Sequence, residues 1–444
     1  MSRDAAISRN FDLVVVGAGP AGLAAATAAA ALGKRVAVLD DNPNPGGQIW
    51  RAGIYPDAHP DPAKARAIAA FSASGAEFFS GRQVVNAAGP GSLDAWVEST
   101  KTLESFTCLK LILATGARER FLPFPGWTLP GVFGPGGLQA LARAGFDIRG
   151  KRIVVAGTGP LLLAVAAHLK LVGATIVTIA EQSPISRLMP FFGSLLAHPN
   201  KLRQGLRLRA SLAGTPYRTG CWPVAVDGHR EVSAVRLSNG ARTWTEPCDL
   251  LACGFHLVPN VELAMLLGCN IGPDGVTVDE NQQTSIPHAY CAGEPTGIAG
   301  VDAARLQGEV AGLAAAGDMQ NAARFHRRRD AEAGFGKAMN RAFALRPEVL
   351  SLAQPDTIVC RCEDVRYRDL EAQARELGGW TDAKLQTRCG MGPCQGRVCG
   401  PAIEQLFGWR NNSVRPPLYP IPVSAFCTAT STGVDSEPNT PPSE

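Results

Sequence analysis

Short, strongly apolar runs alternate with helical segments through most of this chain. The run at 13–16 is rich in β-branched residues and predicts a buried parallel strand. The Ala-rich segment that ends at Leu32 predicts a helix, and the run at 35–39 predicts a second strand. The same order of elements starts again at Arg152. Because strands that alternate with helices form parallel sheets, the pattern predicts an α/β fold built from two similar units.

Changes in composition mark the predicted domain boundaries. A Pro- and Gly-rich stretch at 121–137 separates the two units, cysteines cluster after Ser351, and the end of the chain is rich in Ser, Thr and Pro. A strand and helix predicted over 289–316 return the chain to the first unit. The predicted organisation is a first domain over 1–120 and 285–330, a second domain over 121–284, a linker over 331–350, a small domain over 351–422 and a disordered tail over 423–444.

Glycines follow the first predicted strand in the order G-x-G-x-x-G, at Gly17, Gly19 and Gly22. The first allows a tight turn, the second lets a pyrophosphate approach the backbone, and the third lets helix and strand pack closely. The helix N-terminus adds free N–H groups and the positive end of its dipole. Asp40, at the end of the second strand, can accept both ribose hydroxyls of an adenosine. These features together predict a dinucleotide site in a Rossmann-like domain.

Two later strand ends suggest which dinucleotide binds there. The strand that ends in Ala114-Thr115-Gly116 is typical of flavoproteins with two dinucleotide-binding domains. In such proteins an acid after a later strand contacts the ribityl chain, and here Glu294 replaces the usual Asp. No C-x-x-x-x-C pair follows Asp40, so the dithiol of disulfide reductases is missing. We predict an FAD site made by Gly17, Ala18, Gly19, Pro20, Ala21, Gly22, Asp40, Asp41, Gly47, Gln48, Thr115, Gly116, Gly293 and Glu294.

The second unit departs from the dinucleotide pattern, because Leu162 replaces its third glycine. A bulky side chain there separates helix and strand or fills space that a nicotinamide dinucleotide needs. Glu181 stands where an acid would bind the ribose. We expect a Rossmann-like scaffold that no longer binds NAD(P), with binding of NAD(P) or of ATP in another pose left open.

Five of the twelve cysteines lie between Cys360 and Cys399. Cys360 and Cys362 form a C-x-C pair, and Cys394 and Cys399 form a C-x₄-C pair. Four thiolates from two loops suit a [2Fe–2S] cluster or zinc, but C-x-C is unusual for zinc sites. We therefore predict a [2Fe–2S] cluster, with zinc and non-ligand cysteines as alternatives. Cys389 lies in the same loop as the second pair and competes as a ligand.

Composition excludes several other classes of function. The 444 residues are 45% hydrophobic and 18% charged, as expected for a globular protein. A formal net charge of +4 is too small to indicate nucleic acid or an anionic membrane as a partner. The apolar runs are too short to cross a bilayer, and the N-terminus lacks an apolar signal core. We expect a cytoplasmic protein without disulfides.

With these motifs placed, the sequence resembles the flavin and iron–sulfur subunits of heteromeric amino-acid dehydrogenases, a family that includes subunits of opine oxidase, hydrogen cyanide synthase and D-hydroxyproline dehydrogenase. The resemblance covers roughly 11–423 and is carried by NPNPGGQI, ARERFLPFPGWTLPGV, GEPTGIAG, VCRCEDV and TR-x-GMG-x-CQGR-x-C. The C-terminal motifs also resemble the bacterioferritin-associated ferredoxin type of [2Fe–2S] domain. Since the position of Cys389 is usually not cysteine in this family, the resemblance implies Cys360, Cys362, Cys394 and Cys399 as ligands.

The resemblance also implies partners and a role. Its members assemble with a D-amino-acid-oxidase-like flavoprotein, and some contain a small ferredoxin-like subunit or FMN at the interface. Flavin accepts two electrons and the cluster carries one, so we expect an electron relay from a partner that oxidises an amino or imino acid. No residue lies in a recognisable catalytic motif. The alternatives are a self-sufficient NAD(P)H-dependent reductase and a mainly structural subunit.

Overall fold

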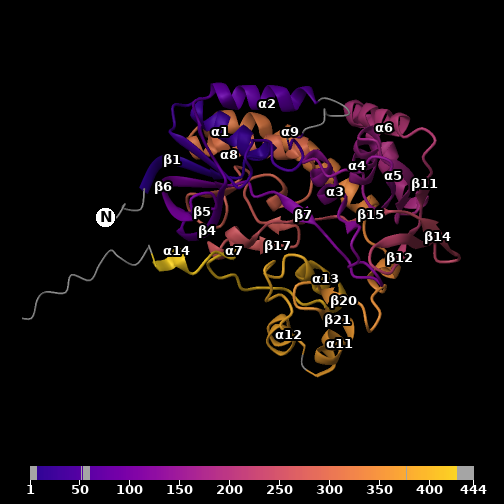
Figure 1. Ribbon diagram of the computed structural model, residues 1–444. Helices are drawn as coiled ribbons and strands as arrows, with labels where there is room; N and C mark the ends of the chain where they lie inside the picture. The colour runs from indigo at the N-terminus through magenta and orange to yellow at the C-terminus, as the bar shows by residue number, and fades with distance from the viewer. Residues whose placement is uncertain (1–7, 52, 54–60, 377, 428–444) are drawn as a thin grey trace, which may run out of the picture.

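The computed structural model describes residues 8–51, 53, 61–376 and 378–427. Two α/β units make up the larger part of the molecule, and a small C-terminal module lies below them in Figure 1. None of the helices in these described ranges is long and apolar enough to cross a membrane. The predicted α/β class and the separate cysteine-rich module are confirmed.

The first unit contains a seven-stranded sheet in the order β3-β2-β1-β6-β5-β4, with β19 paired to β6. Strands β2, β1, β6 and β19 are parallel, so their carboxyl ends meet at one edge. Helices α1, α2 and α8 belong to the same unit. The bounds are β1 Ser8–Val16, α1 Pro20–Ala30, β2 Val36–Asp40, α2 Pro62–Ala73, β3 Glu77–Ser80, β4 Arg82–Gly89, β5 Ser92–Val97, β6 Thr102–Leu113, β19 Ala289–Cys291 and α8 Val301–Ala316.

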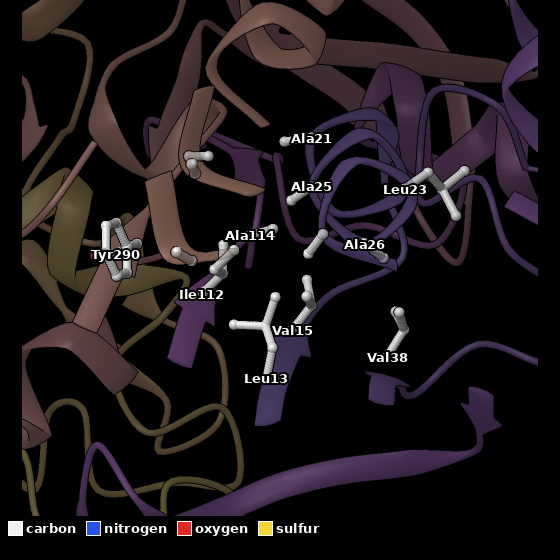
Figure 2. Close-up of a cluster of buried hydrophobic side chains, with 14 of the residues drawn as sticks. Leu13, Val15, Ala21, Leu23, Ala25, Ala26, Val38, Ile112, Ala114 and Tyr290 are labelled. Atoms are coloured by element: carbon white, nitrogen blue, oxygen red, sulfur yellow. The ribbon is translucent and has the colours of Figure 1, made fainter. Parts of the chain in front are cut away.

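Small residues let the helices of this unit approach closely. Figure 2 shows the alanines of α1 above the apolar side chains of β1 and β6, and the cluster is buried. On its other side α1 packs against α8 at two glycines. A Cβ at Gly308 would lie 2.0 Å from the carbonyl oxygen of Ala21, and one at Gly312 would lie 2.3 Å from that of Ala25. The close packing of α8 on α1 places the middle of α8, at Gly308, beside the first turn of α1.

The second unit contains a five-stranded sheet in the order β11-β10-β9-β15-β8 and a three-stranded antiparallel sheet, β12-β13-β14. The antiparallel pair of β7 and β16 connects the two units. The bounds are β7 Ala117–Glu119, β8 Val132–Phe133, α3 Pro135–Arg143, β9 Arg152–Thr158, α4 Leu161–Leu171, β10 Thr175–Glu181, α5 Ile185–Ser194, η1 Leu195–Ala197, α6 Pro199–Ser211, β11 Tyr217–Thr219, β12 Trp222–Gly228, β13 Val232–Ser238, β14 Thr243–Pro247, β15 Leu250–Phe255 and β16 Leu257–Pro259.

Two boundaries differ from those predicted. The expected linker over 331–350 is helical, because α9 runs from Met319 to Ala342 and α10 spans Pro347–Leu350. Phe335 holds α9 in place by packing against Phe191 and Phe343. The return to the first unit also begins before residue 285. The elements α7 Glu262–Leu266, β17 Ile271–Gly272 and β18 Gly275–Val276 contribute Leu263, Ala264, Cys269 and Val276 to a core cluster of the first sheet.

The C-terminal module has its own small core, and a short helix follows it. The core contains Trp380 and three of the clustered cysteines. The predicted disordered tail is wrong for its first residues, since Ala425 on α14 is buried with Val85 and Trp96; residues 428–444 lie outside the described part. The bounds are β20 Ile358–Cys360, β21 Val365–Arg366, α11 Tyr367–Glu376, α12 Trp380–Thr387, α13 Cys399–Phe407 and α14 Ser424–Cys427.

Candidate functional site

Most of the predicted FAD residues lie at one edge of the first sheet. Gly17 follows β1, Asp40 ends β2, Thr115 comes two residues after β6, and Gly293 comes two residues after β19. The four strands are parallel and adjacent, so these segments meet at the carboxyl edge where α/β sheets bind ligands.

Three glycines shape the turn after β1, and each does so for a different reason. Gly17 has a φ of +106°, and a Cβ there would lie 2.3 Å from the carbonyl oxygen of Ala114. A Cβ at Gly22 would lie 1.8 Å from the carbonyl oxygen of Gly17. At Gly19, by contrast, a Cβ would meet nothing within 4 Å. Gly17 and Gly22 are therefore needed by the fold, while Gly19 leaves bare backbone beside open space, as a pyrophosphate requires. Across the turn, a Cβ at Gly47 would lie 2.9 Å from the Cα of Gly19.

Asp40 is buried against this turn. Its Oδ2 accepts a hydrogen bond of 2.6 Å from the backbone N–H of Ala18, and its Oδ1 accepts one of 2.8 Å from that of Asn42. Oδ1 also accepts a hydrogen bond of 2.8 Å from the side-chain amide of Asn42, so Oδ2 is the oxygen with a further lone pair that a ribose hydroxyl could use. Asp41 and Gln48 are exposed, and they accept hydrogen bonds from the side chains of Asn42 and Arg51.

Asn260 fixes the turn after β6, a role that the sequence analysis missed. Its side-chain amide donates to the carbonyl oxygen of Thr115 at 2.9 Å, and the Thr115 hydroxyl donates to the carbonyl oxygen of Asn260 at 2.7 Å. The backbone N–H of Asn260 donates to the carbonyl oxygen of Gly116 at 3.0 Å. Since Asn260 stands alone after a short strand, no spacing signal marked it.

Glu294 provides the strongest test of whether FAD fits. The Gly293 N–H donates to Oε1 of Gln307 at 2.8 Å, and the Gly300 N–H donates to Oε1 of Glu294 at 2.9 Å. Oε2 of Glu294 is buried without a hydrogen-bond partner among the described residues. Burial raises the pKa of Glu294 to about 7. A buried acceptor of this kind needs a donor, and a ribityl hydroxyl is a suitable one, so the residues present fit FAD.

We expect FAD affinity to rise with pH up to about 7. Hydroxyl donors bind an ionised carboxylate better than a protonated one, so bound FAD would lower the pKa of Glu294 from the value of about 7 that burial causes. By linkage, affinity is lost as the pH falls below 7 and is constant above it. FAD titration of the apoprotein at a series of pH values, followed by flavin fluorescence, measures this. Glu294→Gln should remove the pH dependence, and a wild-type affinity independent of pH would contradict the assignment.

In the second unit, Glu181 lies at the end of β10, as Asp40 lies at the end of β2. Its carboxylate is fully buried and accepts hydrogen bonds of 2.8 Å from the N–H groups of Gly159 and Ser183. Burial raises the pKa of Glu181 to about 7. Leu162 neither faces nor fills a nucleotide space, because its side chain is buried in the core with Val155.

The chain itself covers this edge of the second sheet. Oγ1 of Thr158 lies 3.1 Å from the carbonyl oxygen of Phe343. The side-chain amide of Gln182 donates to the carbonyl oxygen of Ala344 and accepts from the N–H of Arg346, both at 3.1 Å. The segment after α9 therefore lies where the ribose of a bound dinucleotide would lie in a unit of this type.

The four predicted cluster ligands lie together in the C-terminal module, and Cys389 lies among them. The Sγ atoms of Cys360, Cys389 and Cys399 are all within 4.8 Å of one another and are buried. The half-buried Cys394 contacts the thiols of Cys399 and Cys362. Sulfur ligands from two loops fit a [2Fe–2S] cluster.

Arg118 connects the cluster loop to the flavin edge. Its Nε donates to the carbonyl oxygen of Arg397 at 3.1 Å, and its Nη1 donates to Oδ1 of Asn260 at 2.7 Å. Arg397 lies between Cys394 and Cys399 in the sequence, and Asn260 holds the Thr115 turn. The two predicted sites are thus joined by a short hydrogen-bonded path.

Two protein families match the two parts of the chain that contain these sites. Residues 11–308 match the pyridine nucleotide-disulphide oxidoreductase family, and residues 358–409 match the BFD-like [2Fe-2S] binding domain. The opine oxidase A protein of Agrobacterium tumefaciens (strain Ach5), one subunit of that oxidase, is 33% identical, over 92% of this chain and 88% of that protein. The hydrogen cyanide synthase subunit HcnB of Pseudomonas protegens is 31% identical, over 93% of this chain and 97% of that protein.

A solved structure shows the same fold. L-proline dehydrogenase from P. horikoshii has a TM-score of 0.68 and 16% sequence identity, covering 94% of this chain and 79% of that chain. The two family matches and the group of thiols support FAD and a [2Fe–2S] cluster as the cofactors. The chain belongs to the pyridine nucleotide-disulphide oxidoreductase family and is a homologue of the opine oxidase A and hydrogen cyanide synthase HcnB subunits, with a C-terminal BFD-like [2Fe–2S] domain.

Proposed function

We propose that this chain is the electron-transfer subunit of a heteromeric FAD-dependent dehydrogenase that acts on the CH–NH or CH–NH₂ group of amino acids, opines or hydroxyproline-like imino acids. The observation that carries the proposal is the path from Thr115 through Asn260 and Arg118 to the loop of Cys394 and Cys399. When bound, FAD accepts two electrons and the [2Fe–2S] cluster carries one at a time.

The residues of this chain hold and orient the two cofactors in the proposal. Gly19 and the N-terminus of α1 bind the pyrophosphate of FAD, Asp40 binds the ribose, and Glu294 binds the ribityl chain. The ligands of the [2Fe–2S] cluster are Cys360, Cys362, Cys394 and Cys399. Arg118 fixes the cluster loop against the turn of Thr115. The side chains at both sites bind cofactors, so substrate oxidation is assigned to another subunit.

The proposed partner is a D-amino-acid-oxidase-like flavoprotein that breaks the C–H bond beside nitrogen. Two observations support a heteromer: the relatives named above are subunits, and their similarity to this chain covers more than nine tenths of its length. The proposed complex also includes FMN at the interface between the subunits and a small ferredoxin-like subunit. A cytoplasmic location fits the eleven free cysteines among the described residues.

Purification of the complex from its native host tests this function. We expect a flavoprotein partner to copurify, and an amino or imino acid to reduce the flavin of this chain and then its cluster under anaerobic conditions. The isolated chain should not respond to the same compounds. Direct substrate oxidation by the isolated chain would contradict the proposal. Substrate turnover by the complex without reduction of the flavin and cluster of this chain would contradict it too.

We expect NADH and NADPH to leave the flavin of the isolated chain oxidised. The carboxylate of Glu181, which stands at the ribose position of this unit, is fully buried, and the segment with Phe343 and Ala344 covers the sheet edge. Anaerobic mixing followed by flavin absorbance measures this, with dithionite as the control that shows a reducible flavin. Stoichiometric bleaching by NADH would favour the self-sufficient reductase instead.

A further inference from the structure

Five thiols surround a site that needs four. A [2Fe–2S] cluster takes four cysteine ligands, two on each iron, because bridging sulfides fill the other two positions of each iron. The motif assigns those positions to Cys360, Cys362, Cys394 and Cys399. Cys389 remains, yet it is 1% exposed and lies among the assigned ligands.

The five thiols are not evenly spread. Cys360, Cys389 and Cys399 form a buried group with all three Sγ atoms within 4.8 Å of one another. In a tetrahedral site with metal–sulfur bonds of about 2.3 Å, neighbouring sulfurs lie about 3.8 Å apart. This group is therefore compact enough to share one metal ion. Cys362 is exposed, and its thiol contacts that of Cys394.

The backbone around Cys389 holds it in this place. It directly follows the C-cap of α12, Arg388, whose φ is +64°, and precedes Gly390, whose φ is +79°. The ring of Trp380 packs on this turn so closely that a Cβ at Gly390 would lie 2.8 Å from it. Trp380 and Cys389 belong to the same buried cluster as Cys360 and Cys399. Cys389 is thus fixed beside the two ligands and does not lie in a mobile position at the surface.

We propose that Cys389 is a reserve ligand for the iron bound by Cys360 and Cys399, able to replace either one. In the exchange, the Cys389 sulfur forms an iron–sulfur bond and its proton passes to the neighbouring departing thiolate, which leaves the iron as a thiol. No electron is gained or lost. The inference depends on the cluster alone and is independent of the proposed partner and substrate.

The position of Cys389 predicts an asymmetry among the four assigned ligands. Cys360→Ala and Cys399→Ala should each keep most of the cluster, because a third thiol lies within reach of the same iron. Cys394→Ala should lose it, since the thiols that it contacts are both already assigned as ligands. Cys389→Ala alone should keep the full cluster, and Cys389→Ala combined with Cys399→Ala should lose it.

Iron and acid-labile sulfide per FAD, together with the EPR spectrum of the dithionite-reduced full chain, measure these outcomes. We expect Cys399→Ala to retain more than about half of the wild-type iron with shifted g values, and the double variant to retain less than about a tenth. The FAD content reports correct folding of each variant. Equal iron loss in Cys399→Ala, Cys360→Ala and Cys394→Ala would overturn the proposal. Loss of the cluster in Cys389→Ala alone would overturn it too, by making Cys389 a resident ligand.

Discussion

Gly22→Val is expected to abolish FAD binding and to destabilise the protein. A Cβ at this position would lie 1.8 Å from the carbonyl oxygen of Gly17, which is backbone and cannot move without opening the turn. Overpacking of this kind commonly costs about 1–3 kcal/mol or more of folding free energy. The loss of turn geometry should weaken FAD binding by more than about 100-fold, equivalent to about 2.7 kcal/mol. Thermal unfolding and FAD titration of the apoprotein measure the two effects.

Gly19→Ala separates the role of the glycines in folding from their role in binding. Because a Cβ at Gly19 meets nothing within 4 Å, the melting temperature of the apoprotein should fall far less than in Gly22→Val, only by the cost of Ala at the N-cap of α1, while FAD affinity falls. Gly193→Ala is a control on α5, where a Cβ also meets nothing within 4 Å; it should leave FAD affinity unchanged, and the higher helix propensity of Ala should keep or slightly raise the melting temperature. Normal FAD binding by both Gly19→Ala and Gly22→Val would show that the dinucleotide lies elsewhere.

The parallel strands and the glycine turn could be predicted because their signals are local. Apolar runs and the spacing of Gly17, Gly19 and Gly22 lie within a few residues of one another, and each glycine is explained by its own backbone geometry. The helix predicted over 301–316 agrees with α8 for the same reason. Gly308 and Gly312 of this helix indicate a close contact with another helix, here α1, and the sequence analysis did not use them.

Contacts between distant segments could not be predicted from the pattern. Thr115 and Asn260 are 145 residues apart, and Arg118 and Arg397 are 279 apart, so only the folded chain shows that they meet. The sequence pattern predicts a linker after residue 330, where α9 continues, because this helix is strongly polar and rests on a few aromatic contacts, chiefly those of Phe335.

The group of cysteines shows both what the sequence pattern can predict and what it cannot. The C-x-C and C-x₄-C pairs predicted the location of a metal site, but spacing alone could not decide how closely Cys389 approaches Cys360. That distance depends on the left-handed turn at Arg388 and Gly390 and on the Trp380 ring that packs against it. Side-chain packing of this kind leaves no periodic mark in the sequence.

Cys394→Ser is expected to remove the cluster while FAD stays bound. The cluster site lies in a module with its own buried core, and the flavin residues lie on the first sheet, so loss of one cofactor should not unfold the other site. Iron should fall from about two per FAD to near zero, since a [2Fe–2S] cluster needs all four ligands. In the complex, substrate should still reduce the flavin. Reduction of a one-electron acceptor should slow by more than about 100-fold, because electrons reach that acceptor through the cluster. Visible absorbance, iron analysis and stopped-flow reduction measure these quantities.

Cys108→Ser is the matched control for this variant, because Cys108 is a half-buried cysteine on β6 outside the thiol group. It should retain both cofactors at wild-type ratios. Simultaneous loss of FAD and iron in Cys394→Ser, with Cys108→Ser intact, would mean that the two sites fold as one unit through Arg118 and Asn260. In that case Arg118→Met should lose both cofactors as well. If the two sites fold independently, Arg118→Met should keep both cofactors and slow only the transfer of electrons from flavin to cluster.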